Sequence, residues 1–114
     1  MHVLERYADY LANHPERVSE LFAEDGYWYD GGMKLIGRDK AAHYGRAEIH
    51  ANFARPGRPP TPVSGVLING NAMRYNVHAG DIVVEALAVV NLDEDGLIRS
   101  FVTRCMIPGR TGSN

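Results

Sequence analysis

The second half of the chain, from residue 63 onward, consists of short apolar stretches separated by turn signals, a pattern typical of neighbouring β-strands. Residues 63–68 and 71–77 flank Asn69-Gly70, a dipeptide that favours a type I′ β-hairpin. A second turn is predicted at residues 78–81. The next stretch, residues 82–92, is long and nearly continuously apolar, so we expect both of its faces to be covered.

The first half of the chain has helical periodicity instead. Apolar residues recur three and four positions apart over residues 2–13, which predicts a helix. A second, short helix is predicted to begin at Pro15 and to end at residues 25–26. A third helix is predicted over residues 38–54, or from residue 46 if Gly45 interrupts it.

The proline-rich run at residues 55–62 is predicted to be a loop, and a turn at residues 93–96 leads to a last strand over residues 97–107. The order is therefore helix, helix, strand, helix and then four strands. Such segregation predicts an α+β fold in which a curved antiparallel sheet packs on three helices. We expect one domain over residues 1–107 and a flexible tail over residues 108–114.

Composition narrows the class of partner. The chain of 114 residues has 12 basic and 14 acidic residues and a formal charge of −2, so nothing indicates nucleic acid as a partner. No apolar run approaches the roughly 18 residues that a membrane helix needs. The single cysteine, Cys105, and an amino-terminal segment without the apolar core of a signal peptide lead us to expect a cytoplasmic protein.

The stretch GYWYDGG, residues 26–32, holds the main chemical candidate. Strand alternation places Trp28 and Asp30 on one face and Tyr27 and Tyr29 on the other. If the Trp28 face is buried, the pKa of Asp30 is raised, which suits this carboxylate to taking a proton from carbon. Alternatively, Asp30 is only the first residue of a turn that the two following glycines complete.

Several features of the chain together carry a family resemblance. They are Arg6-Tyr7 in the first helix, the segment LFAED at residues 21–25, an aromatic strand ending in Asp30, a Gly-Arg pair opening the third helix, and Asp-Gly before the last strand. With this order of elements, the chain resembles the nuclear transport factor 2-like superfamily, and within it the SnoaL-like polyketide cyclases and the ketosteroid isomerases. The resemblance implies a cone-shaped, cystatin-like roll and a homodimer formed through the outer face of the sheet.

The resemblance to ketosteroid isomerases also implies site residues. Tyr7 matches the tyrosine that donates a hydrogen bond to the substrate oxyanion, and Asp30 matches the aspartate that moves the proton between carbons. The family's second, protonated acid falls here at Ala88 or Val89, neither of which can donate. The nearest acid, Glu85, lies on the opposite strand face from Ala88. A different substrate or a different second donor is therefore required.

Further residues are candidates for the pocket between helices and sheet. We expect it to be lined by Tyr7, Phe22, Trp28, Asp30 and Phe53, with Ala88 on the long strand. His50 could point into the pocket as an acid or base, or could lie on the helix surface.

Other residues are weaker candidates for the functional site. Arg55 and Arg58 could form a basic rim that prefers an anionic substrate, or belong to a solvated linker. His78 is expected at the surface, and Cys105 is expected to be a small buried apolar residue. The five histidines have no ligand spacing, so no metal is expected.

The sequence therefore predicts a cofactor-independent isomerase, lyase or cyclase that acts on a small hydrophobic carbonyl compound. In this hypothesis Asp30 is the base, Tyr7 is the oxyanion donor and Trp28 desolvates the carboxylate. The alternative is a non-catalytic ligand-binding or dimerisation module, which could fill its interior with side chains. Epoxide hydrolysis, a third alternative, would need an arginine between two pocket acids, and the strands offer no convincing second acid.

Overall fold

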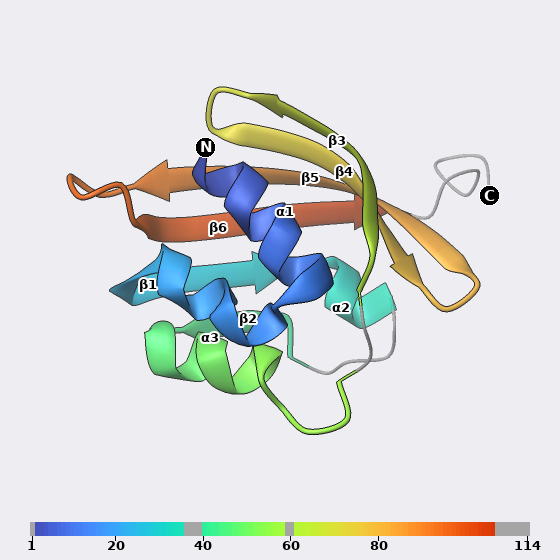
Figure 1. The fold of residues 1–114 in the computed structure, drawn as a ribbon, viewed down its shortest axis with the longest axis horizontal. Helices are drawn as coiled ribbons and strands as arrows, with labels where there is room; N and C mark the ends of the chain where they lie inside the picture. The colour runs from blue at the N-terminus through green and yellow to red at the C-terminus, as the bar shows by residue number, and fades with distance from the viewer. Residues whose placement is uncertain (1, 36–39, 59–60, 107–114) are drawn as a thin grey trace.

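The computed structural model describes residues 2–35, 40–58 and 61–106 and has the predicted α+β architecture: a curved sheet with helices packed against one face (Figure 1). The predicted tail, residues 108–114, lies outside the described residues. The elements in chain order are α1 (Val3–Asn13), the 3-10 helix η1 (Pro15–Leu21), β1 (Phe22–Asp30), α2 (Gly32–Leu35), β2 (Ala42–Tyr44), α3 (Arg46–Phe53), β3 (Val63–Asn69), β4 (Ala72–Ala79), β5 (Ile82–Leu92) and β6 (Ile98–Met106).

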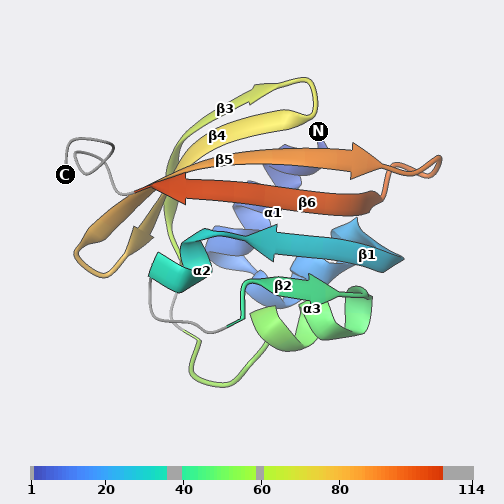
Figure 2. The same ribbon diagram turned by 180° about the vertical axis from the view of Figure 1, so that it is seen from behind.

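The six-stranded sheet has the order β2-β1-β6-β5-β4-β3 (Figure 2). Strands β3 to β6 form an antiparallel meander, as short turns between them require. The pair β1 and β6 runs parallel, unlike the rest of the sheet, and the long segment between these two strands provides the crossover that a parallel pair requires. This pairing sets Trp28 beside Phe101 and Asp30 beside Thr103.

The first helix follows the prediction and begins with a capping box. The His2 Nδ1 atom accepts a hydrogen bond from the Leu4 amide at 3.0 Å, and the Glu5 carboxylate accepts one from the His2 amide at 3.1 Å. These two bonds satisfy amides that lack a partner in the first turn.

Two predicted helix boundaries change. The second helix ends at Leu21 and not at residues 25–26, because Phe22 already pairs with Ile98 at the start of β1. The third helix takes its shorter form from Arg46, since residues 42–44 form β2. Gly45 separates the two elements with a φ of 87°, a conformation that favours glycine. Residues 38–39, the start of the longer alternative, lie outside the described residues.

The predicted hairpin at residues 69–70 is confirmed, but its turn is not type I′. That turn requires positive φ at two consecutive residues. Here Gly70 has a φ of 60°, and no non-glycine residue in the described part of the chain has positive φ.

Aromatic side chains fill the space between the helices and the inner face of the sheet. The Tyr7 ring stacks on Phe101 with centroids 4.2 Å apart. The Trp28 ring meets the edge of Phe53 at 5.0 Å. The largest fully buried side chains are Trp28, Tyr7, Tyr75, Phe22, Phe53 and Phe101. Because each such ring buries roughly 150–250 Å², these six side chains form the main part of the core and fix the helices on the sheet.

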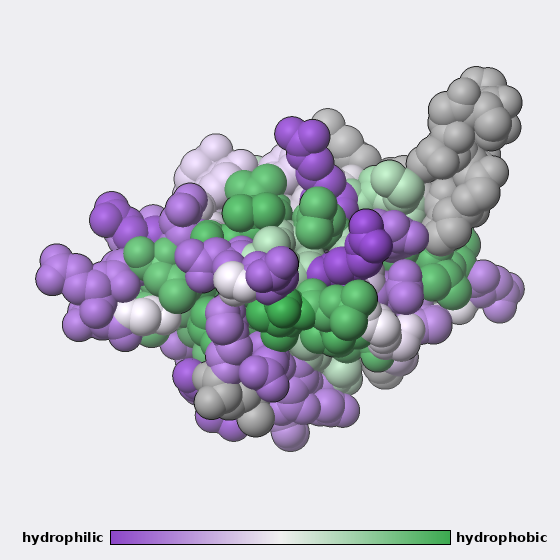
Figure 3. Space-filling model, turned by 90° about the horizontal axis from the view of Figure 1, so that it is seen from above, coloured by the Kyte–Doolittle hydropathy of each residue, from purple (hydrophilic) through white to green (hydrophobic). Residues whose placement is uncertain are grey.

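The outer face of β5 is exposed in the single chain, whereas the sequence led us to expect that both faces of this strand are covered by other parts of the protein. Leu87 and Val89 are 47% and 51% exposed, and Val83 is 40% exposed. Seen from the side of β3 and β4, hydrophobic patches lie between polar side chains on the surface (Figure 3).

Among the described residues, no helix is both long enough and apolar enough to cross a bilayer.

Candidate active site

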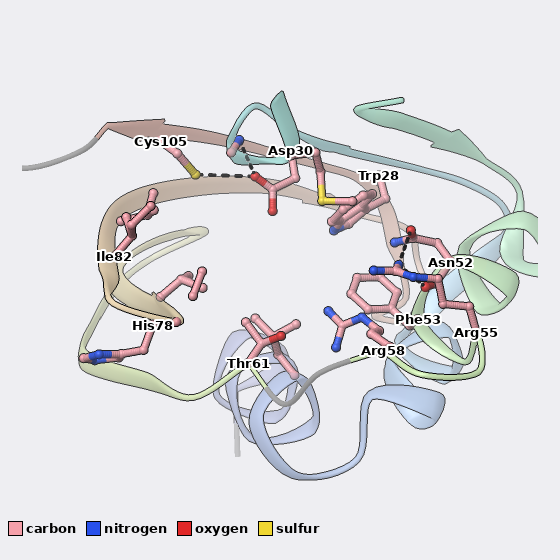
Figure 4. A pocket seen from close by; sticks show the side chains of 17 residues that line it. Trp28, Asp30, Asn52, Phe53, Arg55, Arg58, Thr61, His78, Ile82 and Cys105 are labelled. Carbon is pink, nitrogen blue, oxygen red and sulfur yellow. Dashed lines mark hydrogen bonds between the residues drawn. The ribbon is translucent and has the colours of Figure 1, made fainter. Parts of the chain in front are cut away.

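A cavity of about 530 Å³ opens between the inner face of the sheet, the end of β1, helix α3 and the segment that follows it (Figure 4). Such a volume suits a small organic ligand. The residues that line it are Leu11, Trp28, Asp30, Gly32, Met33, Asn52, Phe53, Arg55, Arg58, Thr61, Val77, His78, Ala79, Gly80, Ile82, Val84 and Cys105.

Asp30 lies in the wall of this cavity with one carboxylate oxygen anchored. Its Oδ1 atom accepts a hydrogen bond from the Gly32 amide at 2.8 Å and a weaker one from the Cys105 thiol at 3.4 Å. The other oxygen points into the cavity (Figure 4). The turn after β1 thus orients the carboxylate and leaves one oxygen for a ligand.

Glycine is needed at position 32 because the backbone there passes very close to the side chains of Asp30 and Cys105. A Cβ atom at position 32 would lie 2.8 Å from Cys105 Sγ and 3.1 Å from Asp30 Oδ1. At Gly31 the nearest contact of an added Cβ would be 3.4 Å, to the Thr103 carbonyl oxygen. Only the second glycine of the pair is therefore required by packing.

Burial raises the pKa of Asp30 above its ordinary value, since the charged form loses water. The Gly32 amide, the Cys105 thiol and the Arg58 charge act in the opposite direction. Burial, with the neighbouring Asp30 charge, raises the pKa of the Cys105 thiol to about 12, so this thiol stays protonated and remains a donor at neutral pH.

Tyr7 lies in the core, outside the cavity lining. Its hydroxyl oxygen accepts a hydrogen bond from Trp28 Nε1 at 3.0 Å. Burial and the Asp30 charge raise the pKa of Tyr7 far above its ordinary value. The phenol is therefore neutral, and it keeps its own proton for donation.

Besides Tyr7, two further residues have buried hydroxyl groups, Tyr75 and Thr103. Tyr75 Oη and Thr103 Oγ1 are 3.4 Å apart and share a hydrogen bond. Burial raises the pKa of Tyr75 well above its ordinary value, and the neighbouring Asp30 charge adds to the effect. Thr103 pairs with Ala88 in the sheet, so a hydroxyl lies beside the position where the resemblance placed a missing acid.

Two arginines line the cavity, as one of the two sequence interpretations expected. The Arg55 Nη1 atom donates to the Asn52 carbonyl oxygen at 3.0 Å and to Asn52 Oδ1 at 3.4 Å. The Arg58 guanidinium lies 5.1 Å from the centroid of the Phe53 ring. Both arginines are half-buried.

The structure brings only some of the predicted pocket residues together. Trp28, Asp30 and Phe53 line the cavity, but Phe22 and Ala88 are buried in the core away from it. His50 is exposed on α3 and lies outside the lining, with its Nδ1 atom 3.3 Å from Ser19 Oγ. Of the two alternatives for His50, the structure has the one on the helix surface, because the neighbouring Ile49 takes the inward face of this short helix.

Two residues that sequence reasoning placed elsewhere belong to the cavity. His78 lines it, and its Nε2 atom is 2.8 Å from Ser64 Oγ. Cys105 lines it too and is partly exposed, where a buried apolar residue was expected. Alternation along β6 places Cys105 on the same face as Phe101 and Thr103. This alternation was the signal in the sequence from which the inward position of Cys105 could have been predicted.

Among residues 2–35, 40–58 and 61–106, no three histidine, cysteine, aspartate or glutamate side chains gather as metal ligands.

The comparisons with known proteins identify the fold. No family model matches the chain, and no curated protein matches its sequence. Among solved structures, an NTF-2-like protein of unknown function from Burkholderia xenovorans is 14% identical, with 93% of this chain and 81% of that chain covered and a TM-score of 0.67. An uncharacterised protein with a cystatin-like fold from Silicibacter pomeroyi is 19% identical, with coverages of 93% and 75% and the same TM-score.

A candidate ketosteroid isomerase from Kribbella flavida is 20% identical, with 91% of this chain and 75% of that chain covered and a TM-score of 0.62. At these identities the likeness concerns the fold alone. The NTF2-like, cystatin-like fold that the sequence predicted is confirmed. Function has to be argued from the residues of this chain.

Proposed function

We propose that this protein binds a small, mostly apolar carbonyl compound in the cavity and that Asp30 moves a proton on it, as in an isomerase, lyase or cyclase. The observation that carries the proposal is the geometry of Asp30. One oxygen is fixed by Gly32 and Cys105, and the other is directed into a largely apolar cavity. A carboxylate with a raised pKa in such a place suits general base catalysis.

The step begins with the Asp30 oxygen that faces the cavity. This oxygen takes a proton from the carbon next to the carbonyl group, and the electron pair moves to the carbonyl oxygen as an enolate forms. Trp28 and Phe53 exclude water from this side of the ligand. The protonated Asp30 then returns the proton to another carbon, or the enolate expels a leaving group or closes a ring.

Tyr7 is the proposed donor to the enolate oxygen, on the basis of the resemblance and of its neutral hydroxyl. Because this residue does not line the cavity, its role needs a test of its own. Loss of an oxyanion donor lowers a rate by about 10²- to 10³-fold. We expect a loss of this size for Tyr7→Phe, and an unchanged exchange rate in this variant would exclude Tyr7 as the donor.

The test is proton exchange on carbon, which does not require the natural substrate. The neutral ketone 2-tetralone is incubated with the protein in D₂O, and deuterium incorporation next to the carbonyl group is followed by NMR. We expect Asp30→Asn to lower the catalysed rate by about 10²- to 10⁴-fold. Asp25→Asn is the matched control, because Asp25 lies on the same strand but is exposed.

Equal exchange rates for wild type and Asp30→Asn would refute Asp30 as the base. If wild type binds the ketone but does not exchange its protons, the second candidate, a non-catalytic ligand-binding protein, gains support. The hollow interior favours this candidate over a module that fills its interior with side chains.

A further inference from the structure

Asn52 places a buried polar side chain in the wall of the cavity. This residue of α3 is only 6% exposed, and it belongs to the lining. Within residues 2–35, 40–58 and 61–106 its Nδ2 atom donates to no acceptor. Buried amide groups in proteins normally have a hydrogen-bond partner. An acceptor atom on a ligand in the cavity would give this nitrogen such a partner.

The neighbouring Arg55 determines which end of the Asn52 amide a ligand meets. Arg55 Nη1 donates to the Asn52 carbonyl oxygen at 3.0 Å and to Asn52 Oδ1 at 3.4 Å. Because a guanidinium group has donors and no acceptor, the amide atom that faces Arg55 has to be the oxygen. Figure 4 shows the amide nitrogen on the side of Trp28. The NH₂ group is therefore the end of this side chain that a ligand can reach.

Trp28 lies between this amide and the proposed base. Trp28 and Asp30 share one face of β1 and both line the cavity. The Trp28 ring meets the edge of Phe53, the residue next to Asn52, at 5.0 Å. In Figure 4 the indole ring lies between the Asp30 carboxylate and the Asn52 amide. A flat ligand that packs on the indole can therefore present a carbon atom to Asp30 and its carbonyl oxygen to Asn52.

We propose that the Asn52 amide donates a hydrogen bond to the carbonyl oxygen of the ligand and is the second donor that Ala88 cannot supply. The inference rests on the proposed function, because it assigns the oxygen of the same ligand. When Asp30 takes a proton from the neighbouring carbon, negative charge develops on this oxygen, and the Nδ2–H group stabilises it. Arg55 is then a positioning residue, since it holds the amide in this orientation.

Infrared spectroscopy of bound 2-tetralone, labelled with ¹³C at the carbonyl group, tests the contact directly. A hydrogen bond to a carbonyl oxygen lowers its stretching frequency, so we expect a lower frequency in the wild-type complex than in cyclohexane. The frequency should rise in Asn52→Leu, which removes the donor. It should also rise in Asn52→Asp, which keeps an acceptor for Arg55 and nearly the same size, and which remains usable where the leucine variant fails to fold.

The exchange assay measures the effect of the same variants on proton transfer. Both Asn52 variants should lower deuterium exchange of 2-tetralone by about 10²- to 10³-fold, as for the loss of other oxyanion donors. The matched control is Asn71→Leu, because Asn71 is exposed and outside the cavity lining. This control should equal wild type in both measurements.

Three results of the infrared experiment overturn the inference: no binding of the ketone, a wild-type frequency equal to that in cyclohexane, or an unchanged frequency in both Asn52 variants. Exchange that falls in Asp30→Asn but not in the Asn52 variants also overturns it and retains the proposed base. A carbonyl frequency that depends on Asn52, in a protein that catalyses no exchange, supports the donor and refutes the base. The two proposals therefore fail separately.

Discussion

The consecutive glycines at positions 31 and 32 allow a sharp test of how Asp30 is held. Alanine is sterically possible at Gly31, where an added Cβ has no contact closer than 3.4 Å. At Gly32 the same atom would lie 2.8 Å from Cys105 Sγ, which is about 1 Å inside a normal van der Waals separation. Two adjacent and chemically identical substitutions should therefore have opposite effects.

The magnitudes follow from two contributions. Replacing glycine by alanine at an unstrained position stabilises a protein by about 0.4–1 kcal/mol, because the unfolded chain loses freedom. Neither glycine has positive φ, so this gain applies at both positions. Crowding at Gly32 costs about 1–3 kcal/mol, as for other overpacked sites. We expect Gly32→Ala to be less stable than Gly31→Ala by about 1–3 kcal/mol, or roughly 4–12 °C in melting temperature.

Thermal unfolding followed by circular dichroism measures this difference, and the 2-tetralone exchange assay measures its effect on the base. Crowding at Gly32 displaces Asp30 Oδ1 or Cys105 Sγ, so exchange should fall in Gly32→Ala and stay unchanged in Gly31→Ala. Adding Cys105→Ala to Gly32→Ala removes the closest contact and should recover part of the lost stability. If Gly32→Ala is as stable as Gly31→Ala, the close packing of Asp30, Gly32 and Cys105 is refuted.

Three further predictions concern the base, its thiol partner and the outer face of the sheet. Because burial raises the folded-state pKa of Asp30, its ionisation destabilises the fold as pH rises through that pKa. Asp30→Asn should therefore have a higher melting temperature than wild type at pH 8, and the difference should vanish near pH 4. Equal melting temperatures at pH 8 would contradict this prediction. Cys105→Ala removes a donor to Asp30 and should shift the pH midpoint of exchange upward, whereas Cys105→Ser should restore it. We propose that the exposed side chains of Leu87 and Val89 contact a second copy of the chain in a homodimer. Leu87→Glu should then give monomers in size-exclusion chromatography with light scattering. A monomeric wild type would refute the dimer.

The sequence was most informative where structure depends on local periodicity. The stripe in residues 2–13 predicted α1, and alternation along residues 27–30 predicted that Trp28 and Asp30 share a face. Turn signals located each strand of the meander within a few residues. These features depend on residues near one another in the chain, so one sequence suffices to predict them.

Features that depend on which distant segments meet were not predictable in this way. The parallel pairing of β1 with β6 brings Cys105 to Asp30, and the two residues are far apart in the chain. His78 reaches the cavity because the β4–β5 hairpin extends over it. His50 was ambiguous because a helix of eight residues has few turns from which to identify the inward face.

The two sequence interpretations of Asp30, as the first residue of a turn and as a catalytic base, describe different atoms of one side chain. Oδ1 accepts the Gly32 amide, which is what a turn requires. The other oxygen is directed into the cavity, which is what a base requires. A carboxylate that turned freely would present either oxygen and lose entropy on binding, so the turn itself can pre-organise the base. Gly32 is then as much a part of the proposed site as the carboxylate that it orients.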